Sequence, residues 1–426
     1  MKNLDVLSAL FVGIDVSAAS NVVCAMDFHS NKLLEFSVSN NHPGAAEIAE
    51  RICALMDSSS FKTVIFALES TSFYSIHIAN FLASDQSLMP FNPFVYCLNP
   101  KMTANYRKSF IGMDKTDPKD AFLLADFARV GRINTHPWRG SQFLALQRLT
   151  RHRLHIVEAM SREKAYMVSN IFLKFSELSV LKEDQHPFTS NYTATAEAVL
   201  TEMLTVDELV NMPVEELISF ICNASRNRFH DPEKVAAILQ KAARDSYRLD
   251  RCLYEPLTIS IASSFNLLSA YQAEIKSIEK AIEKTIRGLN HSEYQCLLSI
   301  PGIGPVYSSG ILAEIGSISA FHSQDAIAKY AGLVWKQNQS GNFQAEDTSL
   351  SKAGNRYLRY YLIEAANSVR HHIPEYNHFY HKKLAEVKTH QHKRALALTS
   401  RKLIRLIYGL LDKNQLYSQM KVVSTT

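Results

Sequence analysis

Short apolar runs separated by polar turns dominate the beginning of the chain. They are rich in Val, Ile, Phe and Leu, and this pattern predicts five strands, at residues 11–17, 21–28, 32–38, 62–69 and 93–98. Helical spacing of apolar positions predicts helices at about 44–56 and 73–83, and helical segments on both sides of Asp117. Three consecutive strands followed by alternating helices and strands predict a mixed α/β sheet, in the order expected for an RNase H-like domain.

Two of these apolar strands carry an acid. Asp15 falls inside the first strand and Glu69 closes the fourth. A carboxylate in an apolar strand is costly to bury unless it is paired or binds a metal. In the expected topology the first and fourth strands bring such acids together, and Asp117 and Asp120 follow in Lys-Thr-Asp-Pro-Lys-Asp. Four such acids predict an oxygen-ligand site for Mg²⁺ suited to phosphodiester chemistry.

A structural alternative exists for the second acidic pair. Asp117 followed by Pro118 fits a helix N-cap with proline at the first helical position. Under this interpretation the pair starts a helix and binds nothing. Asp15 is the hardest of the four acids to explain structurally, and it carries the metal hypothesis.

The strand signal ends near residue 140. From about 141 to 289 helical periodicity dominates, and a heptad-like pattern runs from Leu268 to Leu289. It predicts an antiparallel helical arm or oligomerisation stalk, with short helices in the intervening 179–250. An ordinary helical bundle explains the same pattern equally well. We therefore assign this region to architecture.

Glycines mark the start of the last region. An apolar helix end, the turn Gly302-Ile-Gly304 and a second helix at 306–315 match a helix-hairpin-helix. Glycines let backbone N–H groups approach a phosphate closely, and such contacts position a duplex without reading its sequence. The alternative is a plain glycine-rich connection between helices.

Farther on, a serine is surrounded by cationic residues. Ser351 precedes Lys352, and Arg356 and Arg359 fall on the next predicted helix, which begins near Asn355. These cations could stabilise charge that develops on a phosphoryl group. However, a serine is a weak nucleophile without an activating base or metal. From these residues alone, Ser351 as part of a helix start is the simpler interpretation.

Charge and composition limit the classes of partner and the cellular compartment that we expect for this protein. The net charge is only +5, but residues 351–426 contain 14 Lys or Arg against 4 Asp or Glu, which gives this segment +10. Such asymmetry indicates binding to a polyanion. The six scattered cysteines show no metal-ligand or disulfide pattern and predict reduced thiols in a cytosolic protein. No apolar stretch is long enough for a membrane span, so no membrane partner is expected.

Several motifs together resemble the insertion sequence 110 family of transposases, the DEDD recombinases of bacterial mobile elements. They occur in the family's order. With the first residue of each numbered, the motifs are Gly13-Ile-Asp-Val-Ser, Ala67-Leu-Glu-Ser-Thr, Asn99-Pro-Lys, Lys115-Thr-Asp-Pro-Lys-Asp-Ala, Ile300-Pro-Gly-Ile-Gly, Tyr330-Ala-Gly-Leu, Ser340-Gly and Ser351-Lys-Ala-Gly-Asn-Arg-Tyr-Leu-Arg. The resemblance covers roughly residues 11–135 and 290–412.

The resemblance implies a function. Asp15, Glu69, Asp117 and Asp120 correspond to the family's metal-binding acids in a Holliday-resolvase-like domain, and Ser351 matches its nucleophilic serine. The family forms a covalent phosphoserine link with DNA, and its active site combines the acids of one protomer with the serine of another. Its members use a structured bridge RNA that pairs with donor and target DNA, a logic known from other RNA-guided systems.

These inferences give a three-part organisation. We expect an RNase H-like DEDD catalytic domain at 8–140, a helical coiled-coil region at 141–290 and a C-terminal transposase domain at 291–426. The expected protein is an RNA-guided, Mg²⁺-dependent DNA transposase, a homodimer or homotetramer located in the bacterial cytoplasm with DNA. Two alternatives remain: a resolvase-like nuclease in which water attacks, and a non-catalytic DNA-binding protein.

Three features depart from the family pattern or complicate it. Trp335 stands where the family usually has proline, and Asp114 adds a fifth acid beside the pair. Ser349 lies two residues before Ser351 and is a second candidate hydroxyl.

Overall fold

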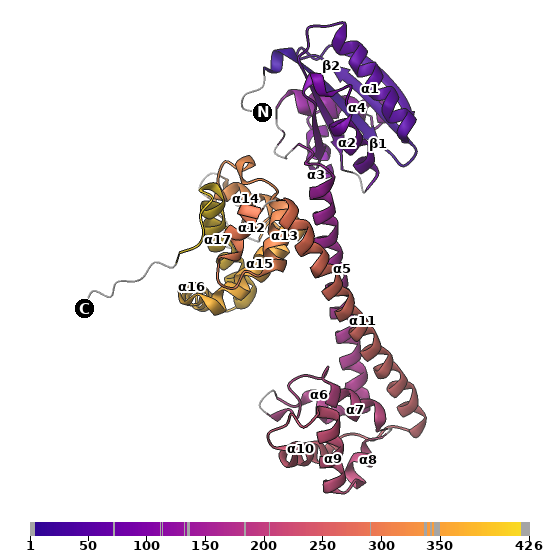
Figure 1. Ribbon diagram of the computed structural model, residues 1–426, viewed down its shortest axis with the longest axis vertical. Coiled ribbons are helices and arrows are strands. Elements are labelled where there is room, and N and C mark those ends of the chain that lie inside the picture. Colours follow the sequence, from indigo (N-terminus) through magenta and orange to yellow (C-terminus); the bar gives the residue numbers. More distant parts are fainter. Residues whose placement is uncertain are drawn as a thin grey trace, which may run out of the picture. The chain divides into compact units, whose positions relative to one another are not determined.

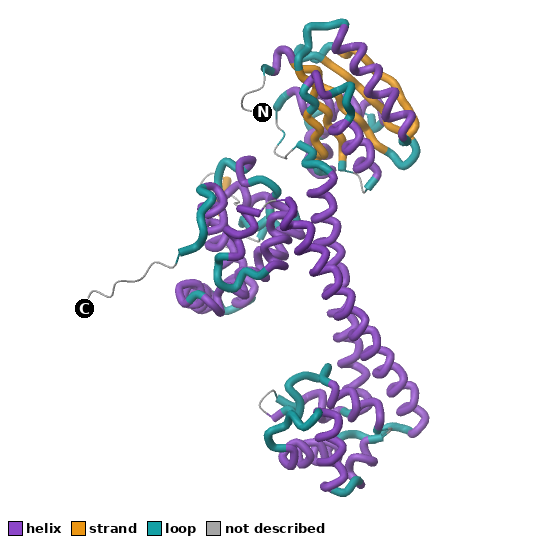
Figure 2. The backbone as a smooth tube through the Cα atoms, in the orientation of Figure 1, coloured by secondary structure: helices purple, strands orange, loops and turns teal. Residues whose placement is uncertain are grey.

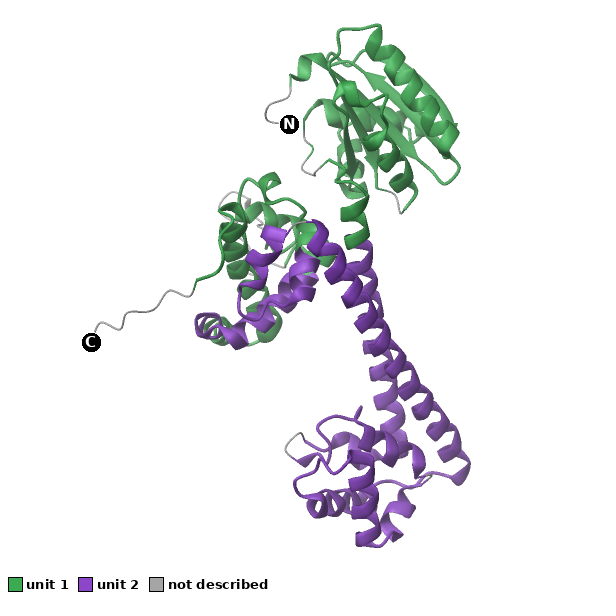
Figure 3. Cartoon of the chain, viewed as in Figure 1, with its two compact units in different colours: residues 1–146, 312–359, 380–426 green, residues 147–311, 360–379 purple. Residues whose placement is uncertain are grey.

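A computed structural model describes residues 5–70, 73–110, 112, 114–131, 133, 137–182, 185–203, 205–289, 291–335, 339–340, 343–344 and 350–418. The motif residue Gly341 and the candidate Ser349 lie outside these residues. The chain divides into two compact units, each assembled from separate stretches of sequence (Figure 3). The first contains 1–146, 312–359 and 380–426, and the second contains 147–311 and 360–379.

The first unit opens with a five-stranded sheet in the order β3-β2-β1-β4-β5. Figure 1 labels β1 and β2 of this sheet and the helices beside it. Its strands are β1 (Ala9–Val16), β2 (Ser20–Met26), β3 (Lys32–Ser39), β4 (Thr63–Glu69) and β5 (Phe94–Leu98). The first three pair antiparallel, whereas β4 runs parallel to β1 and β5 parallel to β4. All five strands were predicted to within two residues.

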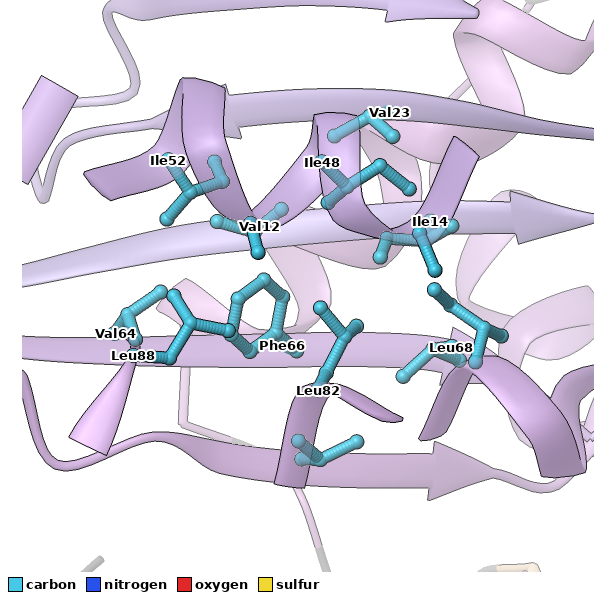
Figure 4. Packing of buried hydrophobic residues seen from close by; sticks show 14 of the residues in the cluster. Val12, Ile14, Val23, Ile48, Ile52, Val64, Phe66, Leu68, Leu82 and Leu88 are labelled. Atoms are coloured by element: carbon cyan, nitrogen blue, oxygen red, sulfur yellow. The ribbon is translucent and has the colours of Figure 1, made fainter. Parts of the chain in front are cut away.

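Helices cover both faces of this sheet. On one face, Val12, Ile14 and Phe66 pack against α1 (His42–Asp57) and α2 (Tyr74–Ser84), as Figure 4 shows. On the other, alternate residues of the same strands pack against α4 (Asp117–Arg129). Strand alternation therefore sends odd and even positions of β1 into two different cores. A short helix, α3 (Pro100–Arg107), also packs against α4.

Two long helices follow the sheet. They are α5 (Ser141–Lys174) and α11 (Arg251–Leu289). Arg153 of α5 pairs with Glu279 of α11 at 2.7 Å, and Glu163 accepts a hydrogen bond from Ser264 at 2.6 Å. Because one partner number rises as the other falls, the two helices run antiparallel, as predicted.

Five short helices connect the long pair. They are α6 (Ser176–Val180), α7 (Ala194–Glu202), α8 (Val206–Asn211), α9 (Val214–Ser225) and α10 (Pro232–Asp245). They share one apolar core with the adjoining parts of α5 and α11. Lys174 is only 3% exposed and donates to the carbonyls of Leu200 and Met203 and to the Thr258 hydroxyl. This buried amine satisfies carbonyl groups at the end of α7, where a helix leaves them unpaired.

The remaining described elements are almost entirely helical (Figure 2). They are α12 (His291–Leu298), α13 (Pro305–Ile315), α14 (Gln324–Tyr330), α15 (Arg356–His372), α16 (Pro374–Ala385) and α17 (Gln391–Asp412), with a two-stranded sheet of β6 (Gln339–Ser340) and β7 (Phe343–Gln344). A mixed sheet followed by helices confirms the α/β plus α class. None of the helices described is both long and apolar enough to cross a membrane.

Candidate active site

Two of the predicted acids lie at the same edge of the sheet. β1 and β4 are parallel neighbours, and Ile14 pairs with Leu68. The next residue on each strand is an acid, Asp15 on β1 and Glu69 on β4. Ile14 and Leu68 point into the core formed with α1 and α2. Strand alternation therefore directs both acids toward the opposite face, where α4 packs.

The other two acids occupy the first turn of α4. Asp117 is the first residue of the helix, and Asp120 follows it within the same turn. The N-cap is Thr116, so the expectation that Asp117 itself caps this helix is wrong by one position. The side chain of Asp117 is therefore free of that structural task. The positive end of the helix dipole favours negative charge at this place.

Two of the other three acids act electrostatically on Asp15. Burial raises the pKa of Asp15, and the negative charges of Asp117 and Glu69 raise it further. The positive charges of Arg107 and Lys115 act in the opposite direction. Like charges in one partly buried place are unfavourable unless a cation balances them. The structure thus brings Asp15, Glu69 and Asp117 together.

Helix α3 provides partners for two of the acids. The Thr103 hydroxyl donates to Glu69 Oε2 at 2.6 Å, and Arg107 forms an ion pair with Asp120. Within the described stretches no three His, Cys, Asp or Glu side chains are grouped tightly enough to hold a metal ion. As donors, however, the four carboxylates fit a hard divalent cation, because such ions select oxygen ligands.

The fifth acid behaves differently. Asp114 is exposed and accepts from Lys119 at 3.1 Å. Its charge does not shift the pKa of Asp15, and neither does that of Asp120. The exposure of Asp114 and its bond to Lys119 place it on the surface of this region. Of the predicted pair, Asp117 is the acid whose charge acts on Asp15.

Ser351 lies in a loop tied to the turn that follows α14. The Ser351 N–H donates to the Val334 carbonyl at 2.8 Å, and the Lys352 N–H donates to Gly332 at 3.2 Å. Lys352 has a φ of 49°, and Gly354 has a φ of 153°. A methyl group at Gly354 would lie 2.4 Å from the Tyr330 carbonyl oxygen, so only glycine permits this close approach.

Asn355, and not Ser351, caps the N-terminus of α15. Its Oδ1 accepts from the N–H groups of Tyr357 and Leu358 in the first turn of α15. Its Nδ2 donates to Glu314 Oε2 at 2.6 Å, and Glu314 is a buried carboxylate only 1% exposed. Among the described residues, Ser351 Oγ meanwhile accepts only a 3.4 Å hydrogen bond from the Ala353 N–H. The helix-start interpretation of Ser351 is therefore unnecessary.

The cationic residues beside Ser351 have unequal positions. Lys352 and Arg356 are exposed, and the Arg356 guanidinium lies 5.0 Å from the centre of the Tyr357 ring. Arg359 is partly buried and donates to the carbonyls of Ala331 and Lys352. Burial and the nearby Arg356 lower the pKa of Arg359. Arg359 thus braces the serine loop, whereas the other two cations face solvent.

The two glycines of the predicted hairpin lie between α12 and α13, in the second unit. Gly302 has a φ of 92°, and a methyl group there would lie 2.9 Å from the Val369 Cα. Gly304 has open space on its Cα, with nothing within 4 Å of an added methyl group. Gly302 therefore allows α15 to pack closely, and Gly304 is the more open of the two.

Sequence reasoning missed four residues that contact the candidate site or its supporting loop: Thr103, Arg107, Glu314 and Asn355. Two of them had a usable signal. Glu314 is a carboxylate inside the apolar run of α13, the same feature that identified Asp15. Asn355 directly precedes a basic, aromatic helix, which is a typical N-cap position. The contacts of Thr103 and Arg107 depend on packing between α3, β4 and α4, which no local pattern encodes.

Comparison with known proteins adds independent evidence. A sequence model described as "Transposase" matches residues 12–172, and one described as "Transposase IS116/IS110/IS902 family" matches residues 294–381. The first match contains all four acids and the second contains Ser351. The two models together span the sheet domain and the serine loop.

Individual relatives agree with the two models. A protein of insertion element IS900 from Mycobacterium paratuberculosis, described as an uncharacterized 42 kDa protein, is 25% identical over 96% of this chain and 97% of its own length. An uncharacterized 44.8 kDa protein of insertion element IS116 from Streptomyces clavuligerus is 23% identical over 98% of both.

A third relative bears a functional name. A pilin gene-inverting protein from Moraxella bovis is 28% identical over 43% of this chain and 58% of its own length. With both family models matched in order and relatives aligned over nearly the whole chain, this protein belongs to the IS110 family of insertion-element transposases.

Proposed function

We propose that this transposase cleaves and rejoins DNA through a phosphoserine intermediate, with Ser351 as nucleophile and Mg²⁺ held by Asp15, Glu69, Asp117 and Asp120. The observation that carries the proposal is the strand register that puts Asp15 and Glu69 one residue past the pair Ile14 and Leu68, together with the charges of Glu69 and Asp117, which both raise the pKa of Asp15. A partly buried cluster of like charges needs a cation, and the oxygen donors suit Mg²⁺. An RNase H-like fold is part of the proposal, supported by the strand order β3-β2-β1-β4-β5.

The serine chemistry conserves phosphodiester bonds. Ser351 Oγ attacks phosphorus, an Oγ–P bond forms, and the bond from phosphorus to one deoxyribose oxygen breaks. The proton released by the serine is matched by the proton that the departing oxygen takes up. A hydroxyl of another strand then reverses these steps at the same phosphorus. Bound Mg²⁺ would stabilise the charge that develops on the phosphoryl oxygens.

The chain's own residues support this chemistry in distinct ways. The bonds to Val334 and Gly332 hold the backbone around Ser351 and so set the place from which its hydroxyl is presented. Lys352 and Arg356 remain exposed and are positioned to bind phosphate. Gly304 offers an open backbone for a further phosphate contact.

The proposal includes partners. Donor and target DNA are the substrates, and a guide RNA from the element selects them by base pairing. The net charge of +10 in residues 351–426 supports binding to a polyanion. The protein acts as a homo-oligomer in which the acids of one copy work with Ser351 of another.

A denaturing gel tests the chemistry directly. Purified protein, the RNA transcribed from the flanking non-coding DNA, Mg²⁺ and labelled donor and target DNA are incubated, and a covalent protein–DNA adduct is sought. We expect an RNA-dependent adduct that is lost in Ser351→Ala and Asp15→Asn but retained in Ser349→Ala. Cleavage without an adduct, unaffected by Ser351→Ala, would refute the nucleophile assignment and support a resolvase-like nuclease. DNA binding that needs no metal and leads to no cleavage would support a non-catalytic DNA-binding protein.

A further inference from the structure

Three side chains on one face of α3 bind carboxylates. Thr103, Tyr106 and Arg107 are spaced three and four residues apart, so they lie on the same side of this helix. Each contacts a different acid: Thr103 contacts Glu69, Tyr106 contacts Asp126 and Arg107 contacts Asp120. Two of these three acids belong to the proposed metal site. In the absence of a metal, helix α3 therefore provides the bonding partners of Glu69 and Asp120.

Arg107 is the cation of this face. Its side chain is 27% exposed and that of Asp120 is 14% exposed, so the pair is shielded from most of the solvent. The same guanidinium lowers the pKa of Asp15. Its Nη1 is buried and has no hydrogen-bond partner among the residues described. Arg107 thus acts on at least two of the four acids, Asp120 and Asp15, through its positive charge. Its Nη1 could donate a further hydrogen bond.

A role confined to bracing α3 against α4 explains this arrangement less well. Tyr106 already joins the helices through its 2.6 Å hydrogen bond to Asp126 and through ring contact with Phe127. Asp126 is also paired with Arg129 of its own helix at 2.6 Å. The packing between these helices therefore has its own anchor, nearly two turns of α4 away from Asp120.

We infer that Arg107 is a built-in counter-ion that competes with the divalent cation for Asp120. The inference rests on the proposed function, since it takes the four acids as the metal ligands. A carboxylate oxygen bonded to a guanidinium has to give up that bond before it can ligate a metal. The free energy of the ion pair is then subtracted from metal binding, which lowers the apparent affinity. Without metal, the same pair keeps mutually repelling acids in place.

Metal binding itself gives the test. Isothermal titration calorimetry with MgCl₂ compares the wild-type chain with Arg107→Met, which keeps the apolar stem and removes the charge. We expect Arg107→Met to bind Mg²⁺ about tenfold more tightly, as loss of a charged hydrogen bond of ordinary strength implies. Its melting temperature without metal should fall, and added Mg²⁺ should restore it. Equal or weaker Mg²⁺ affinity in Arg107→Met overturns the inference.

A matched control and two further variants separate the possible failures. Arg129→Met removes another arginine–aspartate pair from α4, and its Mg²⁺ affinity should match that of the wild type. Arg107→Lys retains a charge without the planar fork and should fold, with an intermediate affinity; an affinity below that of the wild type counts against competition. If Asp15→Asn binds Mg²⁺ as the wild type does, the proposed metal site fails, and the competition inferred here fails with it.

Discussion

β1 approaches α4 very closely at Gly13, and this approach gives a sharp prediction. A methyl group at this position would lie 2.0 Å from the Ala121 carbonyl oxygen and 2.4 Å from the Ala125 nitrogen. Ordinary contact begins at 3.4 Å, so in Gly13→Ala helix α4 has to retreat by about 1.4 Å. Both contacts are backbone atoms, which cannot rotate away. Because Ala121 directly follows Asp120, the retreat also separates the α4 acids from Asp15.

Two consequences follow for Gly13→Ala. Overpacking of this kind costs about 1–3 kcal/mol, so we expect the melting temperature to fall by several degrees. A displacement near 1 Å at reacting groups can cost about 100-fold in rate, so formation of the covalent adduct should fall much further than the loss of folded protein explains.

Thermal unfolding and adduct kinetics measure the two effects at a temperature where the variant is folded. Gly288→Ala is the matched control, since nothing lies within 4 Å of a methyl group at that position in α11. It should stabilise the protein by about 0.5–1 kcal/mol, as alanine does in a helix interior. An unchanged melting temperature with undiminished adduct formation in Gly13→Ala would show that the approach of α4 to β1 does not constrain the acids.

Three further variants test other parts of the structure. Asp15→Asn should raise the melting temperature of the metal-free protein. Because the pKa of Asp15 is raised in the folded state, the stability of the wild type falls as the pH rises from the ordinary carboxyl pKa through the folded pKa. The difference in melting temperature between the two proteins should therefore widen over that range, and a constant difference contradicts this reasoning. Asn355→Ala should cost about 1 kcal/mol from the lost cap and slow adduct formation with DNA affinity unchanged; a normal adduct rate in a gel time course counts against the role of the cap. Lys174→Met should lower the free energy of unfolding in urea by about 2–4 kcal/mol, since three buried acceptors lose their donor; a loss below 1 kcal/mol contradicts that role.

The sheet was predictable because its signals are local. Each strand reads as an apolar run of the right length, and Asp15 and Glu69 stand out as acids within such runs. Their meeting then follows from topology, since β1 and β4 are parallel neighbours with both acids one residue past the pair Ile14 and Leu68. The class of fold and the acids were therefore available from sequence, apart from the one-residue error at the N-cap of α4.

The rest depends on contacts between distant segments. Arg107 reaches Asp120 only because α3 packs on α4, and Asn355 reaches Glu314 across 41 positions of sequence. Neither partner can be deduced from spacing. Arg359 illustrates the same limit: its sequence context indicated phosphate binding, and the loop carbonyls that occupy its guanidinium appear only in three dimensions. Its contact with phosphate, the domain boundaries and the other site assignments stay predictions.

The antiparallel bridge between Trp335 and Leu350 has an evolutionary consequence. It joins the two ends of the intervening segment directly before Ser351, so whatever lies between those ends is closed off at its base. A change in the length of that segment is therefore expected to leave the start of the serine loop in place. A mobile element can thereby vary the length of this segment while the backbone at Ser351 keeps its place.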